Sequence, residues 1–298
     1  MNTATLHAPA SRRAPLLLPA LLACYLIWGS TYFAIHMALA SFPPFFQMGT
    51  RFLVAGGLLM AWVAARGHAL PSLTHWRNAL VIGSLMLGAG MGLVATASQH
   101  LGSGLIATFI AVVPMMTCGW GLLFGRRVTR AELLGMALGL AGVVLLLQGA
   151  SFSAAPVGVA CIAGATLSWS LGSVLSTTRL PLADGPAGFA SEMLCGGAVL
   201  MLISLALGEQ PAWPLQPAAL AAWAYLVVFG SLIAFSAYLY LLAHSSAAVA
   251  TSYAFVNPLI ALFLGVFFGH EVVTGPEWIS CAVILAGVFL ILAAGKKR

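Results

Sequence analysis

The sequence predicts an all-α polytopic membrane protein, with ten transmembrane helices arranged as two inverted five-helix repeats. Of its 298 residues, 61% are hydrophobic and only 6% are charged, whereas a soluble domain carries roughly 25% charged residues. Ten apolar runs long enough to cross a bilayer follow one another along the chain. The short alternating strands of a transmembrane barrel are absent from the sequence, so helices must satisfy the backbone hydrogen bonds.

Each predicted span holds about 20 mostly apolar residues between polar residues, prolines or glycines. In chain order the spans cover residues 15–38, 43–65, 76–98, 102–124, 130–148, 156–178, 186–207, 218–242, 247–268 and 274–294. The first run superficially matches a signal peptide. It is too long for one and leads into further spans, so we interpret it as the first transmembrane helix.

The distribution of cations predicts that both termini are cytoplasmic. With ten spans, these residues all lie on the N-terminal side of the membrane: Arg12, Arg13, Arg66, Arg77, Arg126, Arg127, Arg130, Arg179, Lys296, Lys297 and Arg298. The connections at 39–43, 99–102, 149–155, 208–217 and 269–274 contain no Lys or Arg. The positive-inside rule assigns the cation-rich side to the cytoplasm. The one remaining cation, Arg51, falls within the second span.

Several phrases of the first half recur in the second half. FGRRVTR at 124–130 returns as FGHEVVT at 268–274, and AGVVLLL at 141–147 returns as AGVFLIL at 286–292. LIWGSTYF around Trp28 is matched by LSWSLGSV around Trp169. These anchors occur in the same order with nearly constant offset, which indicates an internal repeat rather than chance similarity of apolar segments.

The repeat predicts the domain organisation. Residues 15–149 form the first five-helix repeat and 150–295 the second, between an N-terminal tail at 1–14 and a basic tail at 296–298. Five spans per copy is an odd number, so the second copy is inverted in the membrane, as in many secondary transporters. The change from Arg126-Arg127 to His270-Glu271 fits this inversion, because only the first of these two loops is then cytoplasmic.

These features resemble the EamA branch of the drug/metabolite transporter superfamily. The resemblance is carried by W-G-S-T near the start, R-F in the second span, and P-x(9)-F-G before a helix ending in A-G-V. The chain is most similar to bacterial YddG-type amino-acid exporters. This resemblance implies a multi-pass protein of the bacterial inner membrane that exports aromatic and other neutral amino acids through a central cavity. Relatives often carry F-G-E after the fourth and ninth spans, whereas here Glu271 comes one place later and Arg126 replaces the first acid.

Aromatic residues near the middle of spans are the first candidates for a substrate cavity. Trp28 and Trp169 are mid-span, whereas tryptophans of the membrane interface belong at helix ends. Each indole N–H needs a partner, which the neighbouring hydroxyl residues of a cavity wall offer. Tyr32 follows Trp28 by one helical turn, so the two share a face. The alternative for these residues is a packing role in the core.

Two prolines are candidate hinges of the transport cycle. Pro114 and Pro258 each leave a backbone carbonyl without its intrahelical donor, and such groups are tolerated at mid-membrane where neighbours or cavity water serve them. A simple packing kink is the alternative. Tyr253 and Asn257 lie beside Pro258 on one face, and the amide suits a zwitterion, so both are predicted to line the substrate path.

Charged and polar residues complete the candidate set. Arg51 and Glu192 lie within spans, where ionisable residues are expected to be functional. Arg51 is a candidate for attracting a carboxylate and Glu192 for carrying a proton, while pairing with helix ends is the alternative for both. A direct salt bridge between them is not expected, because inversion places them toward opposite sides of a core about 30 Å thick. Gln99 and His100 are candidate gating residues at a helix end.

The same composition argues against other function classes. The five cysteines are widely spaced and apolar in context, which predicts no disulfide framework, no metal and no cofactor. The sequence contains no stripe of basic residues that would indicate binding to nucleic acid. The sequence carries no recognisable motif of an intramembrane enzyme. A channel would more often show rings of charged residues. The prediction is a secondary transporter exporting small neutral amphipathic metabolites by alternating access. Exporters of other metabolites or drugs remain the alternative, and a monomer is the expected state.

Overall fold

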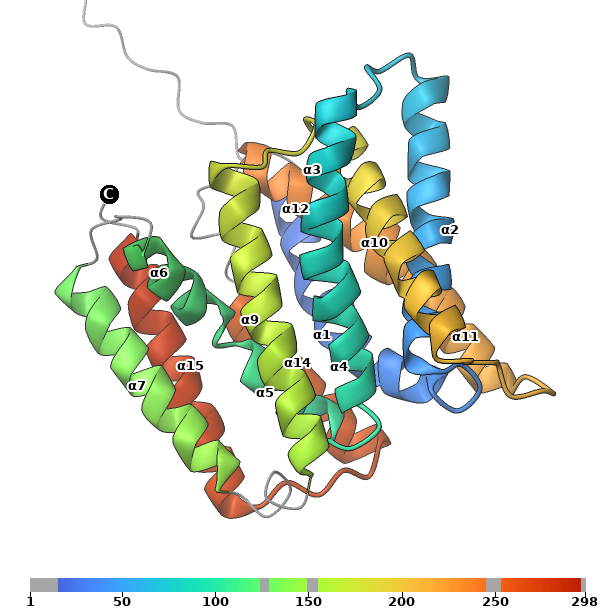
Figure 1. Cartoon of the computed structure of the whole chain (residues 1–298). Helices are drawn as coiled ribbons and strands as arrows, with labels where there is room; N and C mark the ends of the chain where they lie inside the picture. The colour runs from blue at the N-terminus through green and yellow to red at the C-terminus, as the bar shows by residue number, and fades with distance from the viewer. Residues whose placement is uncertain (1–15, 124–128, 149–154, 245–252, 296–298) are drawn as a thin grey trace, which may run out of the picture.

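Helices are the only regular secondary structure in the residues that the computed structural model describes, which are 16–123, 129–148, 155–244 and 253–295 (Figure 1). The first half contains α1 (Leu17–Ala38), α2 (Pro44–Ala65), α3 (Leu73–Gly83), the π-helical stretch η1 (Ser84–Met91), α4 (Gly92–Ala97), α5 (Ser103–Ile110), α6 (Val113–Leu123) and α7 (Arg130–Leu147). The second half contains α9 (Pro156–Thr178), α10 (Pro186–Ala206), α11 (Pro217–Tyr225), the π-helical stretch η2 (Leu226–Ile233), α12 (Ala234–His244), α14 (Tyr253–Phe268) and α15 (Gly275–Gly295).

Local sequence explains where many of these helices begin. A proline stands at the first helical position of α2, α9, α10 and α11, where its missing N–H costs nothing and its fixed φ suits a helix. α3 begins three residues earlier than predicted, because Ser72 caps it: the Ser72 hydroxyl accepts from the His75 N–H at 3.3 Å, and His75 Nδ1 accepts from the Ser72 N–H.

Eight helical stretches in the described part of the chain are long and apolar enough to cross a membrane. They coincide with the first eight predicted spans, since α3, η1 and α4 form one stretch, α5 and α6 another, and α11, η2 and α12 a third. The ninth and tenth predicted spans correspond to shorter apolar helices within Val256–Phe268 and Gly275–Leu290. Both tails and Arg126-Arg127, on which the predicted orientation depends, lie outside the described residues.

The outer faces of the helices are apolar. Large side chains such as Leu18 (66% exposed), Leu140 (65%) and Phe289 (62%) point away from the core on α1, α7 and α15. Exposed apolar surface on this scale marks a membrane or protein interface, and here it extends over helices of membrane-spanning length. The fold is therefore that of a polytopic membrane protein.

Helices of the two halves pack against each other in matching pairs. α2 lies along α10, and α7 lies along α15, side by side in Figure 1. α1 of the first half packs on α12 and α14, while α9 of the second half packs on η1, α4 and α6. The contacts of α1 with α12 and α14 thus have counterparts in the contacts of α9 with α4 and α6.

Four of the six acidic residues stabilise helix N-termini. Glu132 and Glu277 close the first turns of α7 and α15 by accepting from the N–H groups of Thr129 (2.7 Å) and Thr274 (2.8 Å). Glu209 lies beyond α10 and accepts from Phe45 and Phe46 at the start of α2. Glu271 is the fourth. Carboxylates are favourable at these positions because the helix N-terminus carries unpaired N–H groups and positive potential.

The second copy of the repeated phrase, FGHEVVT at 268–274, has a structural role through Glu271. After Phe268 the chain turns through His270 at φ 53°, and the Glu271 carboxylate reaches α5. It accepts from the Ser103 N–H (2.7 Å), the Ser103 hydroxyl (2.7 Å) and the Gly104 N–H (3.2 Å). This glutamate links the connection between α14 and α15 to a helix of the other half.

Replacement of Glu271 by alanine is expected to destabilise the fold by about 1–2 kcal/mol, the usual cost of losing a side-chain cap. Thermal unfolding of the purified protein in detergent measures this loss as a lower midpoint. Asp184→Ala is the control, since Asp184 lies exposed in the connection between α9 and α10. Equal midpoints for the two variants would show that the cap contributes nothing.

Candidate functional site

A cavity of about 240 Å³ lies at the contact between the two halves. Its wall includes side chains from α1, α2, η1, α6, α9, η2, α12 and α14. Eight of the eleven residues singled out from the sequence line it: Trp28, Tyr32, Arg51, Pro114, Trp169, Tyr253, Asn257 and Pro258. Residues distant in the sequence are thus brought together in one place, and both halves of the chain contribute to the wall.

Trp28 is the centre of an aromatic cluster on the cavity wall. Its ring lies 4.8 Å from that of Tyr253, 5.3 Å from that of Tyr238 and 5.5 Å from that of Phe235, between ring centroids. The contacts with Tyr253 and Phe235 are edge-to-face, a favoured geometry for aromatic pairs. The cluster joins α1, α12 and α14, so the cavity wall and the helix packing depend on the same side chain.

The π-helical stretch η2 accepts hydrogen bonds from two of the candidate site residues, Trp28 and Arg51. The indole N–H of Trp28 donates to the carbonyl of Gly230 at 3.3 Å, and Nε of Arg51 donates to the hydroxyl of Ser231 at 2.9 Å. A π-helix widens the backbone turn and is frequent at functional sites. The sequence suggested hydroxyl neighbours as partners of the Trp28 N–H, and the structure assigns this role to a backbone carbonyl instead.

Trp169 occupies an equivalent position against the other π-helical stretch. A Cβ added to Gly90 in η1 would lie 3.0 Å from the Trp169 ring, so the indole packs directly on this backbone. The neighbouring Ser168 donates to the carbonyl of Leu85, also in η1, at 2.8 Å. Each tryptophan therefore rests on the π-helical stretch of the opposite half, at an offset of 142 residues between the two stretches.

The two prolines differ in their effect on the helix but both face the cavity. Pro114 follows a break between α5 and α6, whereas Pro258 lies inside the continuous helix α14. The carbonyls that a proline deprives of a donor are those four residues earlier, at Ile110 and Ala254. Both of these residues also line the cavity. Both prolines therefore lie beside the cavity, where hinges of the transport cycle would lie. Bending of the helices at these points stays a prediction.

Asn257 ties α14 to α1 at the cavity wall. It is 6% exposed, and with its amide in the orientation that satisfies its surroundings, Nδ2 donates to the carbonyls of Tyr25 (3.3 Å) and Tyr253 (3.2 Å). The amide was predicted to meet the substrate. In this structure its donor side is used between helices, so Asn257 positions the wall as well as lining it.

Three predicted residues lie away from the cavity. Gln99 and His100 are exposed in the connection between α4 and α5, and their gating role stays a prediction. Glu192 is buried in α10 at 6% exposure but is not part of the cavity wall. Among the described residues no ion pair joins Glu192 to Arg51, and the proton-carrying role of Glu192 stays a prediction.

Sequence reasoning missed several members of the wall. Tyr238, Phe235 and Phe189 add aromatic surface, and Met86 and Met91 add flexible apolar surface. These residues carry no local pattern that separates them from ordinary core positions. Ser173 was recoverable, because it lies 141 residues after Tyr32, the same offset that relates Trp28 to Trp169.

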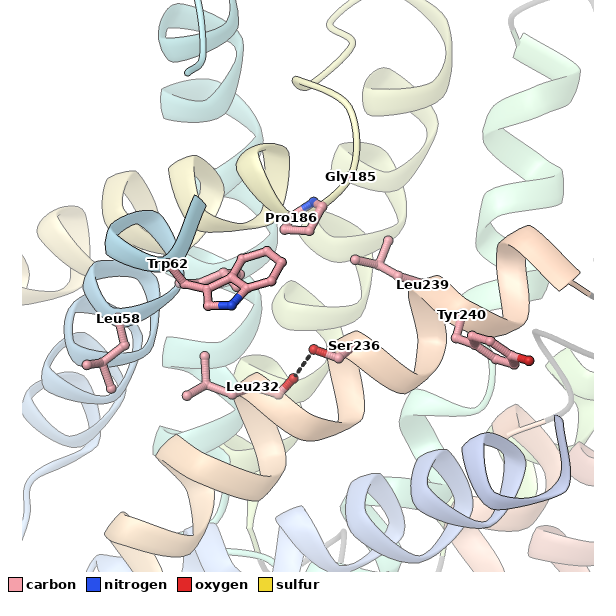
Figure 2. A pocket seen from close by; sticks show the side chains of 9 residues that line it. Leu58, Trp62, Gly185, Pro186, Leu232, Ser236, Leu239 and Tyr240 are labelled. Atoms are coloured by element: carbon pink, nitrogen blue, oxygen red, sulfur yellow. Dashed lines mark hydrogen bonds between the residues drawn. The ribbon is translucent and has the colours of Figure 1, made fainter. Parts of the chain in front are cut away.

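A second hollow lies on the outer surface and has different chemistry. It measures about 960 Å³ and is formed by α2, the start of α10, η2 and α12, with Leu58, Trp62, Pro186, Leu232 and Leu239 on its wall (Figure 2). The Ser236 hydroxyl donates a hydrogen bond to the Leu232 carbonyl at 2.7 Å, so its donor is already used within the helix. This apolar groove suits acyl chains better than a polar solute, so the inner cavity is the candidate site. Within the described residues no cluster of His, Cys, Asp or Glu is arranged to hold a metal.

Comparison with known proteins agrees with this architecture. The chain matches the EamA-like transporter family twice, over residues 16–148 and 156–293. It is 42% identical over 273 residues to YedA of Escherichia coli (strain K12), described as an uncharacterized inner membrane transporter, covering 91% of this chain and 89% of that protein. Protein PecM of Dickeya dadantii is 25% identical, covering 89% and 88% of the two chains.

A chain of known crystal structure has the same fold. It aligns with a TM-score of 0.63 over 95% of this chain and 98% of its own length, at 22% identity. Identity at this level establishes the fold and nothing about the solute. The two family matches together cover nearly all of the described residues, and their boundary falls between α7 and α9. The chain therefore belongs to the EamA-like transporter family.

Proposed function

We propose that this protein is a secondary transporter of the bacterial inner membrane that exports small neutral amphipathic metabolites by alternating access. Aromatic and other neutral amino acids are the expected solutes. The observation that carries the proposal is the inner cavity, whose wall is built from paired positions of the two halves: Trp28 with Trp169, Tyr32 with Ser173, and Pro114 with Pro258. A binding site at the interface of two repeats is where an alternating-access carrier holds its solute.

The inverted repeat is supported by packing as well as by sequence. Each half carries one π-helical stretch in its third predicted span, and each of these stretches packs against the tryptophan helix of the other half. Ten spans related by a two-fold axis in the membrane plane would account for this reciprocal packing of the two halves. Rocking of one half against the other would then open the same cavity to either side in turn.

The size and lining of the cavity support the solute class. An apolar cavity of about 150 Å³ holds benzene, so about 240 Å³ accommodates a solute with one aromatic ring or a comparable aliphatic group. Aromatic rings, hydroxyls, one amide and one guanidinium line it. A phosphate ester would need a clamp of several cations, and among the described residues Arg51 is the one cation on the wall.

Reconstitution in liposomes tests the proposal. We expect saturable uptake of a labelled neutral amino acid such as phenylalanine, reduced by unlabelled aromatic competitors. Repeating the assay with and without a pH gradient shows whether transport is coupled to protons. Non-saturable leak, or no flux for any member of a panel of neutral amino acids and related metabolites, would contradict a carrier of this class.

The inverted topology makes a separate prediction. A reporter tag inserted after Gly125 is expected to lie in the cytoplasm, and one inserted after Gly269 is expected outside it. The physical reason is the arginine pair, which the positive-inside rule retains in the cytoplasm. Accessibility to a membrane-impermeant thiol reagent, with single cysteines at the same two points, measures the outcome. The same side for both tags would refute the inverted repeat.

A further inference from the structure

Arg51 is a buried cation on the wall of the inner cavity. It lies two turns into α2 and is 3% exposed. At a rise of 1.5 Å per residue, its Cα lies about 10 Å along the helix from the first residue. A charge at such a depth is costly unless it is paired or serves a polar pathway.

The surroundings of Arg51 supply hydrogen bonds but no opposite charge. Nε donates to the Ser231 hydroxyl, Nη1 lies 3.7 Å from the Met48 sulfur, and the guanidinium lies 4.8 Å from the centre of the Phe52 ring. None of these groups is anionic, and a thioether is a weak acceptor. No hydrogen bond from Nη2 is found in the described part of the chain. The guanidinium packs over the Phe52 ring, and Arg51 is one of the residues that line the cavity.

The acidic residues of the chain are all accounted for elsewhere. The chain has six Asp and Glu residues, and each lies in the described part. Glu132, Glu209, Glu271 and Glu277 accept from the N–H groups of helix N-termini. Asp184 is exposed in a connection, and Glu192 lies in α10 away from the cavity wall. Within the described residues, no carboxylate therefore compensates the charge of Arg51 in the cavity.

A second unsatisfied polar group lies on the same face of α2. Gln47 precedes Arg51 by four residues, which places the two side chains one above the other. It is fully buried, and neither its amide nitrogen nor its amide oxygen has a hydrogen-bond partner among the described residues. A buried amide without partners is destabilising, because the water it would otherwise bind is lost. This amide is not part of the cavity wall, so the assignment of the solute site depends on Arg51 alone.

We propose that Arg51 binds the carboxylate of the transported solute, so that the cavity selects small apolar monocarboxylates, with or without an amino group, over amines of the same shape. A guanidinium matches a carboxylate through two parallel N–H···O bonds. An ammonium group finds no carboxylate on the wall, though the faces of Trp28, Tyr238 and Tyr253 can accept it. The amino group is therefore tolerated, and the carboxylate is required. This inference rests on the proposed transport function and widens its solute class from neutral amino acids to monocarboxylates that lack the amino group.

Three analogues of one size test the proposal on the purified protein. Phenylalanine carries both groups, 3-phenylpropionate only the carboxylate, and phenethylamine only the amine. We expect the first two to raise the midpoint of thermal unfolding in a saturable manner, and the amine to bind at least tenfold more weakly. Equal stabilisation by the amine and the carboxylate, or stabilisation by the amine alone, would overturn the proposal without any variant being made.

Substitutions of single residues test whether Arg51 is the group that binds the carboxylate. Arg51→Gln is expected to weaken binding of both carboxylates at least tenfold, and Arg51→Lys to retain part of it. Arg66→Gln is the matched control, since Arg66 lies exposed at the end of the same helix, over the Trp62 ring. An Arg51→Gln protein that folds and still prefers carboxylates would also overturn the assignment. If liposomes show saturable flux of solutes that lack a carboxylate, transport stands and only this inference fails. If no solute shows saturable flux, the proposed function itself is lost.

Discussion

Replacement of Trp28 by alanine is expected to reduce saturable transport at least about tenfold while leaving membrane insertion within about twofold of the wild type. The ring makes three aromatic contacts, each contributing about 0.5–1.5 kcal/mol, and a tenfold change corresponds to about 1.4 kcal/mol. The indole N–H also holds the Gly230 carbonyl in η2. Trp169→Ala is expected to have a similar effect, because it removes the equivalent surface on the other half.

The measurement compares initial rates in liposomes with the amount of correctly inserted protein. Trp278→Ala is the matched control, since Trp278 is 44% exposed on α15 and does not line the cavity; its transport is expected to equal that of the wild type. Trp28→Phe keeps a ring but removes the N–H donor, so an intermediate rate is expected. Parallel loss of transport and insertion in both alanine variants would identify the tryptophans as packing residues.

Replacement of Gly287 by alanine is expected to destabilise the protein by about 1–3 kcal/mol, the cost of overpacking a close contact. Gly287 lies in the second A-G-V phrase, on α15 against α7. An added Cβ would lie 2.7 Å from both the Gly135 oxygen and the Gly139 nitrogen. These atoms are backbone atoms, which cannot rotate away as a side chain can. The two helices would have to separate, with loss of the packing that holds membrane helices together.

Thermal unfolding in detergent measures this effect, and the chain offers a matched control. Gly57 lies within α2, and an added Cβ there would meet no atom within 4 Å. Gly57→Ala is therefore expected to be neutral or stabilising by at most about 1 kcal/mol, because alanine is the better helix former. Similar midpoints for the two variants would mean that the α7–α15 contact is looser than the structure indicates.

The agreement between sequence and structure is closest for features that depend on apolar length and local chemistry. Helix starts at Pro44, Pro156, Pro186 and Pro217 follow from the restricted φ of proline, and the first eight predicted spans coincide with helices long enough to cross a membrane. The mid-span positions of Trp28 and Trp169 predicted a cavity wall, and both residues line the inner cavity. In contrast, Glu271 showed no sign of its contact with α5, because the two are separated by more than 160 residues.

The sequence by itself determined the membrane class, the positions of the helices and the internal repeat, since hydropathy and repeated phrases are properties of the chain alone. Only the tertiary structure decided that Arg51 faces the cavity and Glu192 does not, although the two lie at equivalent positions. It also decided that the Trp28 N–H donates to a backbone carbonyl of η2, rather than to a neighbouring hydroxyl, and that Trp169 packs on η1. The physical reason is that an apolar pattern fixes which segments are helical in a membrane, but every face of a mostly apolar helix looks alike until its neighbours are in place.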